Sequence, residues 1–301
     1  ISSYASYFWQ PIMNLGNIFN NFINNIAYLE RIFETMDEPV TVKDAENAVK
    51  MPEIRGEVTF DHVNFSYDES KQILKDVSFT VKPGESVALV GPTGAGKSTI
   101  VNLISRFYNV NGGRVLIDGQ DISQVTIHSL REQMGIMMQD SFIFSGDIED
   151  NIRYGKLDAT LEEIVNASKI VCADEFISKM LDGYQTEVRE RGSMLSQGQK
   201  QLISFARTLL SDPAILILDE ATSSIDVQTE KALQTGLNAM LKGRTSFIIA
   251  HRLSTIRNCD KIMYIDNGGI MESGTHDELM AKKGYYYKLY TAQLDEVQKA
   301  G

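Results

Sequence analysis

The stretch GPTGAGKST, residues 91–99, has the residue types and spacing of a phosphate-binding loop. It fits the pattern G-x-x-x-x-G-K-[ST], and it follows an apolar run, residues 87–90, that is typical of a buried strand. Glycines let backbone N–H groups turn inward around phosphate oxygens. Lysine can reach the β- and γ-phosphates, and serine can ligate Mg²⁺. We therefore predict a phosphate site at Gly91, Pro92, Thr93, Gly94, Ala95, Gly96, Lys97, Ser98 and Thr99.

A phosphate loop of this kind works with a strand that ends in a carboxylate, and AILILDE, residues 214–220, fits that description. Asp219 would support the Mg²⁺ shell, and Glu220 is placed to orient or deprotonate water. A second apolar run, SFIIAH, ends in His251. Because parallel strands present their carboxyl ends at one edge of a sheet, we expect His251 to contact the γ-phosphate.

Two further side chains have a weaker pattern. Gln139 follows the apolar residues 135–138 and precedes a loop, from which its amide could reach Mg²⁺ or water. Tyr67 lies in the turn after the first predicted strand, where its ring could stack on adenine. Spacing alone favours an ordinary loop amide and an ordinary loop tyrosine.

The stretch MLSQGQK, residues 194–200, reads as the start of a helix. Ser196 is the expected N-cap, and Gln199 is placed to complete a capping box. Gly198 has no side chain near the first backbone N–H groups, so this helix start has the chemistry of an anion site. The residues alone do not explain why the chain needs a second such site.

Bulk composition excludes several classes of protein. The 301 residues are 43% hydrophobic and 23% charged, which favours one large or two modest folded domains over disorder. The net charge is −11 without a stripe of Lys and Arg, so we expect no nucleic-acid partner. Cys172 and Cys259 lack metal-ligand spacing and are expected to be small buried side chains. The chain begins with Ile rather than Met, which suggests a fragment of a longer protein.

The first segment reads as one long helix. Residues 1–29 carry no charged side chain, and apolar residues recur at steps of three and four at Phe8, Ile12, Leu15, Phe19, Phe22, Ile26, Leu29 and Phe33. Six asparagines fall on the opposite side. This pattern fits the cytoplasmic end of a membrane helix, and on periodicity alone it fits a soluble amphipathic or coiled-coil helix equally well.

Three segments are predicted to be strands around this chemistry. Residues 56–65 alternate apolar and polar side chains and are expected to form an edge strand, and residues 77–81 a second strand. The stretch KIMYIDNGGIMESG, residues 261–274, predicts a hairpin with a tight Asn-Gly turn.

Taken together, these motifs resemble the nucleotide-binding domain of an ABC transporter. The resemblance extends over about residues 55–292 and rests on motifs in the family's order: FSY (65–67, the A-loop), GPTGAGKST (Walker A), MMQD (137–140, the Q-loop), LSQGQKQ (the signature), ILILDE (Walker B), SSID (223–226, the D-loop) and AHR (250–252, the H-loop).

The resemblance implies an α/β fold: a P-loop NTPase core with a mostly parallel sheet, an antiparallel β-subdomain and an α-helical signature subdomain at about 140–205. It implies ATP and Mg²⁺ as ligands, with Tyr67 on adenine, Asp219, Ser98 and Gln139 toward Mg²⁺, Glu220 as general base and His251 on the γ-phosphate. It also implies that a second domain receives this chain's Ser196, Gln197, Gly198, Gln199 and Asp226 at its own ATP.

Residues 8–39 are similar to the last transmembrane helix and linker of exporter-type half-transporters. The implied domains are residues 1–38, the cytoplasmic end of that helix; 39–54, a linker; and 55–301, the nucleotide-binding domain. The implied partners are transmembrane domains and a second nucleotide-binding domain, at the cytoplasmic face of a cell membrane. Phe142 and Phe144 would meet coupling helices of the membrane domain.

Three positions depart from the common pattern of the family. Gln197 stands where the signature usually has Gly, Arg189 where exporters often have Gly, and Ile225 where Leu is frequent. The sequence LSQGQ resembles some subunits of heterodimeric exporters, so both a homodimer and a heterodimer stay open.

Two rival functions belong to other classes. A soluble ABC-type ATPase of DNA repair would need a long coiled coil between Walker A and the signature, and the 99 residues from Lys97 to Ser196 leave no room for one. A related ATPase of translation would usually carry two such cassettes. A non-catalytic regulatory binder would need to lack Glu220 or Lys97, and both are present.

Overall fold

The computed structural model describes residues 2–68, 71–138, 142–188, 192–219, 227–250 and 252–300. The chain divides into two compact units, Ile1–Lys43 and Asp44–Gly301. The boundaries expected after residues 38 and 54 remain predictions.

The first unit contains one helix, α1 (Ser2–Met36), which spans the predicted apolar stripe. Every side chain that is described on α1 is exposed, including the phenylalanines of the stripe. Among the described helices, none is both long and apolar enough to cross a lipid bilayer.

A six-stranded sheet forms the centre of the second unit, in the order β12-β11-β3-β10-β9-β6. Its strands are β3 (Ser86–Val90), β6 (Met134–Met137), β9 (Ile215–Asp219), β10 (Thr245–Ile249), β11 (Lys261–Asp266) and β12 (Gly269–Gly274). Only β11 and β12 pair antiparallel; every other pair in this sheet is parallel. The predicted mostly parallel core is therefore confirmed.

The alternating side chains of the parallel strands build two separate cores, because successive residues of a strand point to opposite faces. In β3, Val87 and Leu89 belong to the core that also contains the antiparallel sheet and helix α2 (Lys97–Ile104). Ala88 and Val90 belong to the core that contains the helical region. The six-stranded sheet thus lies between these two layers.

The second sheet is antiparallel, as predicted, in the order β2-β1-β4-β5. Its strands are β1 (Val58–Ser66), β2 (Gln72–Val81), β4 (Gly112–Ile117) and β5 (Gln120–Asp121). The prediction that residues 56–65 form an edge strand is wrong, because β1 pairs with β2 on one side and β4 on the other. Alternation of apolar and polar side chains shows that one face of a strand is exposed to solvent. It does not show how many strands pair with that strand in the sheet.

The predicted hairpin forms between β11 and β12. Its two turn residues, Asn267 and Gly268, have φ angles of 50° and 82°. Two positive φ angles are the mark of a type I′ turn, whose twist matches that of the flanking strands.

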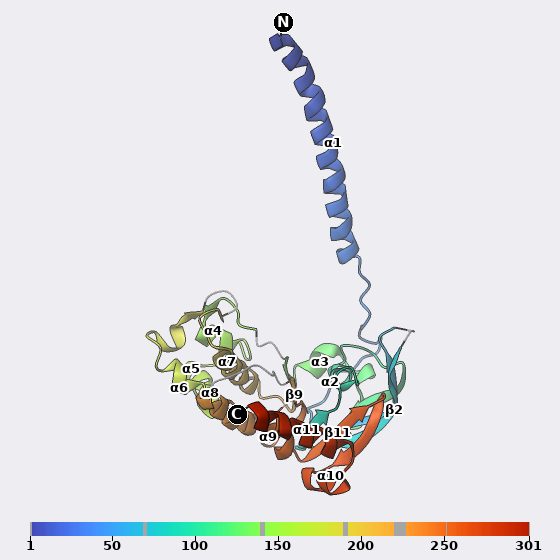
Figure 1. The fold of residues 1–301 in the computed structure, drawn as a ribbon, viewed down its shortest axis with the longest axis vertical. Helices are drawn as coiled ribbons and strands as arrows, with labels where there is room; N and C mark the ends of the chain where they lie inside the picture. Colours follow the sequence, from blue (N-terminus) through green and yellow to red (C-terminus); the bar gives the residue numbers. More distant parts are fainter. Residues whose placement is uncertain are drawn as a thin grey trace. The chain divides into compact units, whose positions relative to one another are not determined.

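Helices α4 (Ile148–Arg153), α5 (Leu161–Ile170), α6 (Asp174–Ile177) and α7 (Gln197–Leu210) lie together, as Figure 1 shows. A short two-stranded sheet, β7 (Gly146–Asp147) with β8 (Glu187–Val188), belongs to the same region. The other helices are α3 (Ile127–Arg131), α8 (Val227–Leu241), α9 (Leu253–Asn258), α10 (His276–Lys282) and α11 (Tyr285–Ala300), with 3₁₀ turns at Ile122–Gln124 and Gly183–Gln185.

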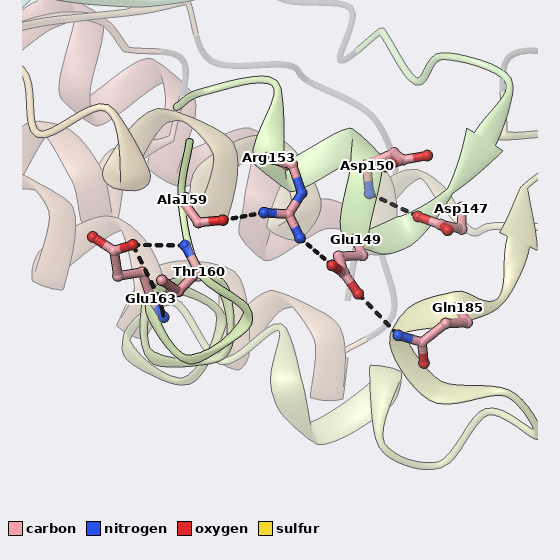
Figure 2. Close-up of polar contacts among 8 residues, drawn as sticks. All are labelled: Asp147, Glu149, Asp150, Arg153, Ala159, Thr160, Glu163 and Gln185. Atoms are coloured by element: carbon pink, nitrogen blue, oxygen red, sulfur yellow. Dashed lines mark hydrogen bonds and ion pairs between the residues drawn. The ribbon is translucent and has the colours of Figure 1, made fainter. Parts of the chain in front are cut away.

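Side-chain caps fix the ends of the short helices in this region (Figure 2). Asp147 accepts a hydrogen bond of 2.7 Å from the Asp150 N–H at the start of α4. Thr160 and Glu163 form a capping box at the start of α5. Arg153 joins the two helices, because its guanidinium donates to the Glu149 carboxylate and to the carbonyl of Ala159.

Helix α7 is fixed to the segment that enters the helical region. The Arg207 guanidinium donates to the Phe142 carbonyl (2.9 Å), the Asn151 carbonyl (2.7 Å) and the Asn151 Oδ1 (3.0 Å). Asn151 in turn bonds both the N–H and the carbonyl of Phe144. Phe142 and Phe144 remain exposed.

This close packing makes Gly155 a sensitive position. A Cβ at Gly155 would lie 2.0 Å from the Arg207 carbonyl oxygen, so we expect Gly155→Ala to destabilise the fold by about 1–3 kcal/mol, the usual cost of overpacking. The matched control is Gly269→Ala, whose Cβ would meet nothing within 4 Å. Denaturant unfolding should separate the two, and equal stabilities would contradict the packing.

Candidate nucleotide site

The phosphate loop connects β3 to helix α2, as the sequence predicts. Gly91, Gly94 and Gly96 have φ angles of 138°, 79° and 107°, a region that side-chain-bearing residues rarely adopt. At Gly91 the space is closed as well, because a Cβ would lie 2.1 Å from the Ile265 carbonyl oxygen. The loop can therefore form a backbone cradle only with glycine at this position.

Helix α2 begins at Lys97 with Gly96 as its N-cap, and no side chain caps it. The first backbone N–H groups of a helix have no partner within the helix, and they carry its positive partial charge. The start of α2 can consequently bind phosphate oxygens directly.

The Lys97 side chain folds back over the loop. Its Nζ donates to the carbonyl oxygens of Gly91 and Pro92, each at 2.8 Å, and only 9% of the residue is exposed. Burial lowers the pKa of the Lys97 ammonium, and the nearby Asp219 carboxylate acts in the opposite direction. The cation is thus held at the phosphate loop by these two carbonyls.

A pocket of about 480 Å³ opens over this loop. It brings together four separate segments of the chain, and its lining residues are Tyr67, Lys71, Ile73, Thr93, Gly94, Gly96, Lys97, Ser98, Thr99, Asp219 and Ile249. Gly91, Pro92 and Ala95, also predicted, lie outside the lining. The carbonyls of Gly91 and Pro92 hold Lys97, and Ala95 is buried.

Sequence reasoning missed three residues of this pocket, namely Lys71, Ile73 and Ile249. Ile73 lies in β2 and Ile249 ends β10, and neither position belongs to a motif. Ile73 lines the pocket only because β2 passes close to the phosphate loop. No local sequence pattern indicates that the two segments lie close together.

Tyr67 lies well before the phosphate loop in the sequence, yet its side chain contacts the loop directly. Its hydroxyl lies 3.1 Å from the Thr99 Oγ1, a hydrogen-bond distance. The residue is 48% exposed, so a planar base could reach its ring and stack on it.

Asp219 and Ser98 provide the oxygen ligands expected for Mg²⁺. Both line the pocket, Asp219 from the end of β9 and Ser98 from the first turn of α2. Carboxylate and hydroxyl oxygens suit Mg²⁺, which usually takes one or two carboxylates together with substrate phosphates. The described parts of the chain contain no group of three or more His, Cys, Asp and Glu able to hold a metal ion.

The start of α7 confirms the predicted capping box. The Ser196 N–H donates to the Gln199 Oε1 at 2.9 Å, and the Ser196 Oγ accepts from the Gln199 N–H at 3.2 Å. Ser196 and Gln197 are exposed, whereas Gly198 is buried. Among the described residues that line the pocket over the phosphate loop, none belongs to the start of α7.

Four predicted site residues, Gln139, Glu220, Asp226 and His251, lie outside the described residues. The same holds for the unusual Arg189 and Ile225. The strands that precede Gln139, Glu220 and His251 in the sequence do end together, because Met137 of β6 pairs with Leu218 of β9, and Asp219 of β9 pairs with Ile249 of β10.

Comparisons with known proteins agree with this geometry. Residues 74–223 match the family model described as "ABC transporter". An uncharacterised ABC transporter ATP-binding protein, YknV, of Bacillus subtilis is 54% identical over 290 residues, covering 96% of this chain and 48% of the relative. A fatty acid ABC transporter ATP-binding/permease protein of Mycobacterium bovis is 45% identical over 289 residues, covering 96% of this chain and 46% of the relative.

The structural comparison gives the same fold. The solved structure of a bacterial Atm1-family ABC exporter with ATP bound is 42% identical, with a TM-score of 0.81 over 96% of this chain and 51% of that one. The chain therefore spans about half the length of the relatives that it matches.

Proposed function

Since the chain belongs to the ABC transporter family, as the ATP-binding domain of an exporter-type protein, we propose that it binds and hydrolyses ATP to drive export across a membrane. ATP-binding domains of this family are ATPases. The observation that carries the proposal is the pocket over the phosphate loop, which combines an aromatic wall, a glycine cradle and a carboxylate.

Each part of the pocket has a chemical role toward ATP. The Tyr67 ring stacks on adenine, the backbone N–H groups at the start of α2 bind phosphate oxygens, and Lys97 binds the β- and γ-phosphates. Ser98 and Asp219, with Gln139, would hold Mg²⁺, which neutralises charge that develops on the phosphates. For Lys97 this requires an exchange of partners, from the carbonyls of Gly91 and Pro92 to phosphate oxygens.

Hydrolysis is assigned to three residues that follow the parallel strands β6, β9 and β10 in the sequence. Glu220 follows Asp219 directly and is the proposed general base that orients water for attack on the γ-phosphorus. Gln139 and His251 are the proposed contacts to water and to the γ-phosphate. Support for these roles comes from their sequence positions after β6, β9 and β10.

The start of α7 is proposed to serve an ATP molecule bound by a second nucleotide-binding domain. Ser196, Gln197, Gly198, Gln199 and Asp226 would complete that partner's site, and two domains would close on two ATP molecules. Support comes from an exposed, capped helix start that takes no part in this chain's own pocket. The partner is a second copy of the chain or a related half-transporter.

Export is proposed on the basis of the relatives. Those matched over about half their length include ATP-binding/permease proteins and an ATP-dependent lipid A-core flippase. Helix α1 would then be the cytoplasmic end of a membrane helix, and Phe142 and Phe144 would contact the transmembrane domains from the cytoplasmic face. A soluble ATPase of DNA repair or translation is not favoured.

Glu220→Gln tests the hydrolytic function. We expect ATP binding to be retained and turnover to fall by roughly 10²-fold, because the variant loses a positioned base but keeps a side chain of the same shape. Phosphate release and ATP-dependent association of nucleotide-binding domains should be measured on the same preparation of the full transporter. A matched control is Glu162→Gln in helix α5, an exposed glutamate outside the pocket. Near-wild-type phosphate release from Glu220→Gln would contradict the assignment.

A further inference from the structure

Three aromatic rings meet beside the nucleotide pocket. The ring centroids of Tyr67 and Tyr108 lie 4.9 Å apart at an interplanar angle of 84°, and those of Tyr67 and Phe65 lie 4.9 Å apart at 87°. Phe65 and Tyr108 also meet, at 5.7 Å and 61°. Each ring therefore contacts both others in the edge-to-face arrangement that aromatic pairs favour.

The three rings come from two separate parts of the fold. Phe65 is buried within β1, and Tyr67 follows the end of that strand. Tyr108 lies beyond the C-terminal end of α2, four residues before β4. The pairing of Tyr67 with Tyr108 thus joins the proposed adenine wall to the far end of the helix whose start binds phosphate.

Tyr67 and Tyr108 differ in their access to the pocket. Tyr67 lines the pocket over the phosphate loop, and Tyr108 does not. Tyr108 lines a separate hollow with Leu103 and Arg106. The ring contact that links Tyr108 to the pocket lining is therefore the one with Tyr67.

An exposed tyrosine that follows the end of a strand can change rotamer. A ligand that stacks on such a ring binds more weakly, because ordering the side chain costs conformational entropy. In this structure Tyr67 is fixed at both ends. Its hydroxyl bonds Thr99 in the first turn of α2, and its ring contacts Phe65 and Tyr108. None of these contacts is a parallel stack, the arrangement that a nucleobase would take.

We propose that Tyr108 is a positioning residue for the nucleobase: its ring holds the Tyr67 ring in the orientation that stacks on adenine. This inference rests on the proposed binding of ATP and deepens it. Tyr108 acts on the base alone, because the phosphate cradle and Lys97 are built from other residues. The contact needs the Tyr108 ring and not its hydroxyl.

The test compares ATP with inorganic tripolyphosphate, which has the phosphates but no base. Dissociation constants should be measured on the full transporter by displacement of a fluorescent ATP analogue. We expect Tyr108→Ala to weaken ATP binding by roughly threefold to tenfold, the range of an aromatic pair contact, and to leave tripolyphosphate binding unchanged. Tyr108→Phe should bind both ligands like the wild type.

A double-mutant cycle separates positioning from an independent effect. In a Tyr67→Ala background, Tyr108→Ala should weaken ATP binding no further, because the ring that it positions is gone. The matched control is Tyr285→Ala, an exposed tyrosine whose ring stacks on Tyr264 away from the pocket, and which should leave ATP binding unchanged.

Several results would overturn the inference. One is equal weakening of ATP and tripolyphosphate by Tyr108→Ala, which would indicate general damage to the loop. Another is a full additional loss in the Tyr67→Ala background. If Tyr67→Ala weakens ATP binding and Tyr108→Ala does not, the inference fails and the proposed function stands. If the wild type itself binds no ATP, the proposed function fails first.

Discussion

Replacing Lys97 with alanine should reduce ATP hydrolysis by about 10³-fold, the upper range for removing one preorganised group that stabilises transition-state charge. The Lys97 ammonium is buried and lines the pocket over the phosphate loop, so its charge already lies beside the proposed phosphate site. In the alanine variant, water that replaces the ammonium cannot stabilise the transition-state charge equally well, because it is neither charged nor held in a fixed orientation. ATP binding should weaken too, since Lys97 contacts both the β- and γ-phosphates in the proposed complex.

Lys71 provides the matched control for this prediction. It is another lysine of the pocket lining, but it is exposed and stands before β2 rather than within the phosphate loop. Lys71→Ala should therefore change hydrolysis only slightly. Phosphate release and ATP binding measured on both variants would decide the matter, and similar losses for the two lysines would show that pocket charge in general, rather than Lys97, carries the effect.

Ser196→Arg should abolish ATP-driven closure of the two nucleotide-binding domains and leave ATP binding at this chain's own phosphate loop nearly unchanged. The Ser196 hydroxyl caps α7 and is exposed where a partner's γ-phosphate is proposed to bind. Arginine there removes the cap and fills the space in front of the helix start. Because the start of α7 lies outside this chain's pocket lining, the affinity of this chain's own phosphate loop for ATP should not fall with closure.

A second capped helix distinguishes closure from stability. Thr275 forms the same capping box with Glu278 at the start of α10, and it is also exposed. Thr275→Arg removes a comparable cap, worth about 1 kcal/mol, away from the proposed interface. Closure followed by a distance probe, together with photolabelling of this chain by azido-ATP, should show loss of closure only in Ser196→Arg. Loss of labelling and closure together would mean that the helix start is only structural.

Local features of the fold were predictable from the sequence because their causes lie within a few residues. The capping box of Ser196 and Gln199 requires only a spacing of three, and it forms as predicted. The turn at Asn267 and Gly268 requires two residues that tolerate positive φ. The phosphate loop requires glycines between a buried strand and a helix, and the backbone supplies that geometry.

Features that depend on contacts between distant segments were not predictable in the same way. The alternation of β1 revealed its buried face but not its two neighbours in the sheet, so its edge position was predicted wrongly. Ile73 enters the pocket only because β2 passes the phosphate loop, and Tyr108 meets Tyr67 only because the segment that follows α2 lies beside the end of β1. The spacing of residues in the sequence predicts neither of these two contacts between distant segments.

The central claim is that the helix start at Ser196 belongs to an ATP site whose phosphate loop lies on another domain. The direct test is a transporter in which one nucleotide-binding domain carries Lys97→Ala and the other carries the arginine substitution of its signature serine. If sites form between domains, both defects fall in one site and the other site stays intact, so the mixed dimer should close on a single ATP although neither variant alone closes. Failure of the mixed dimer to close would contradict the account, because it would place both residues in the site of one chain.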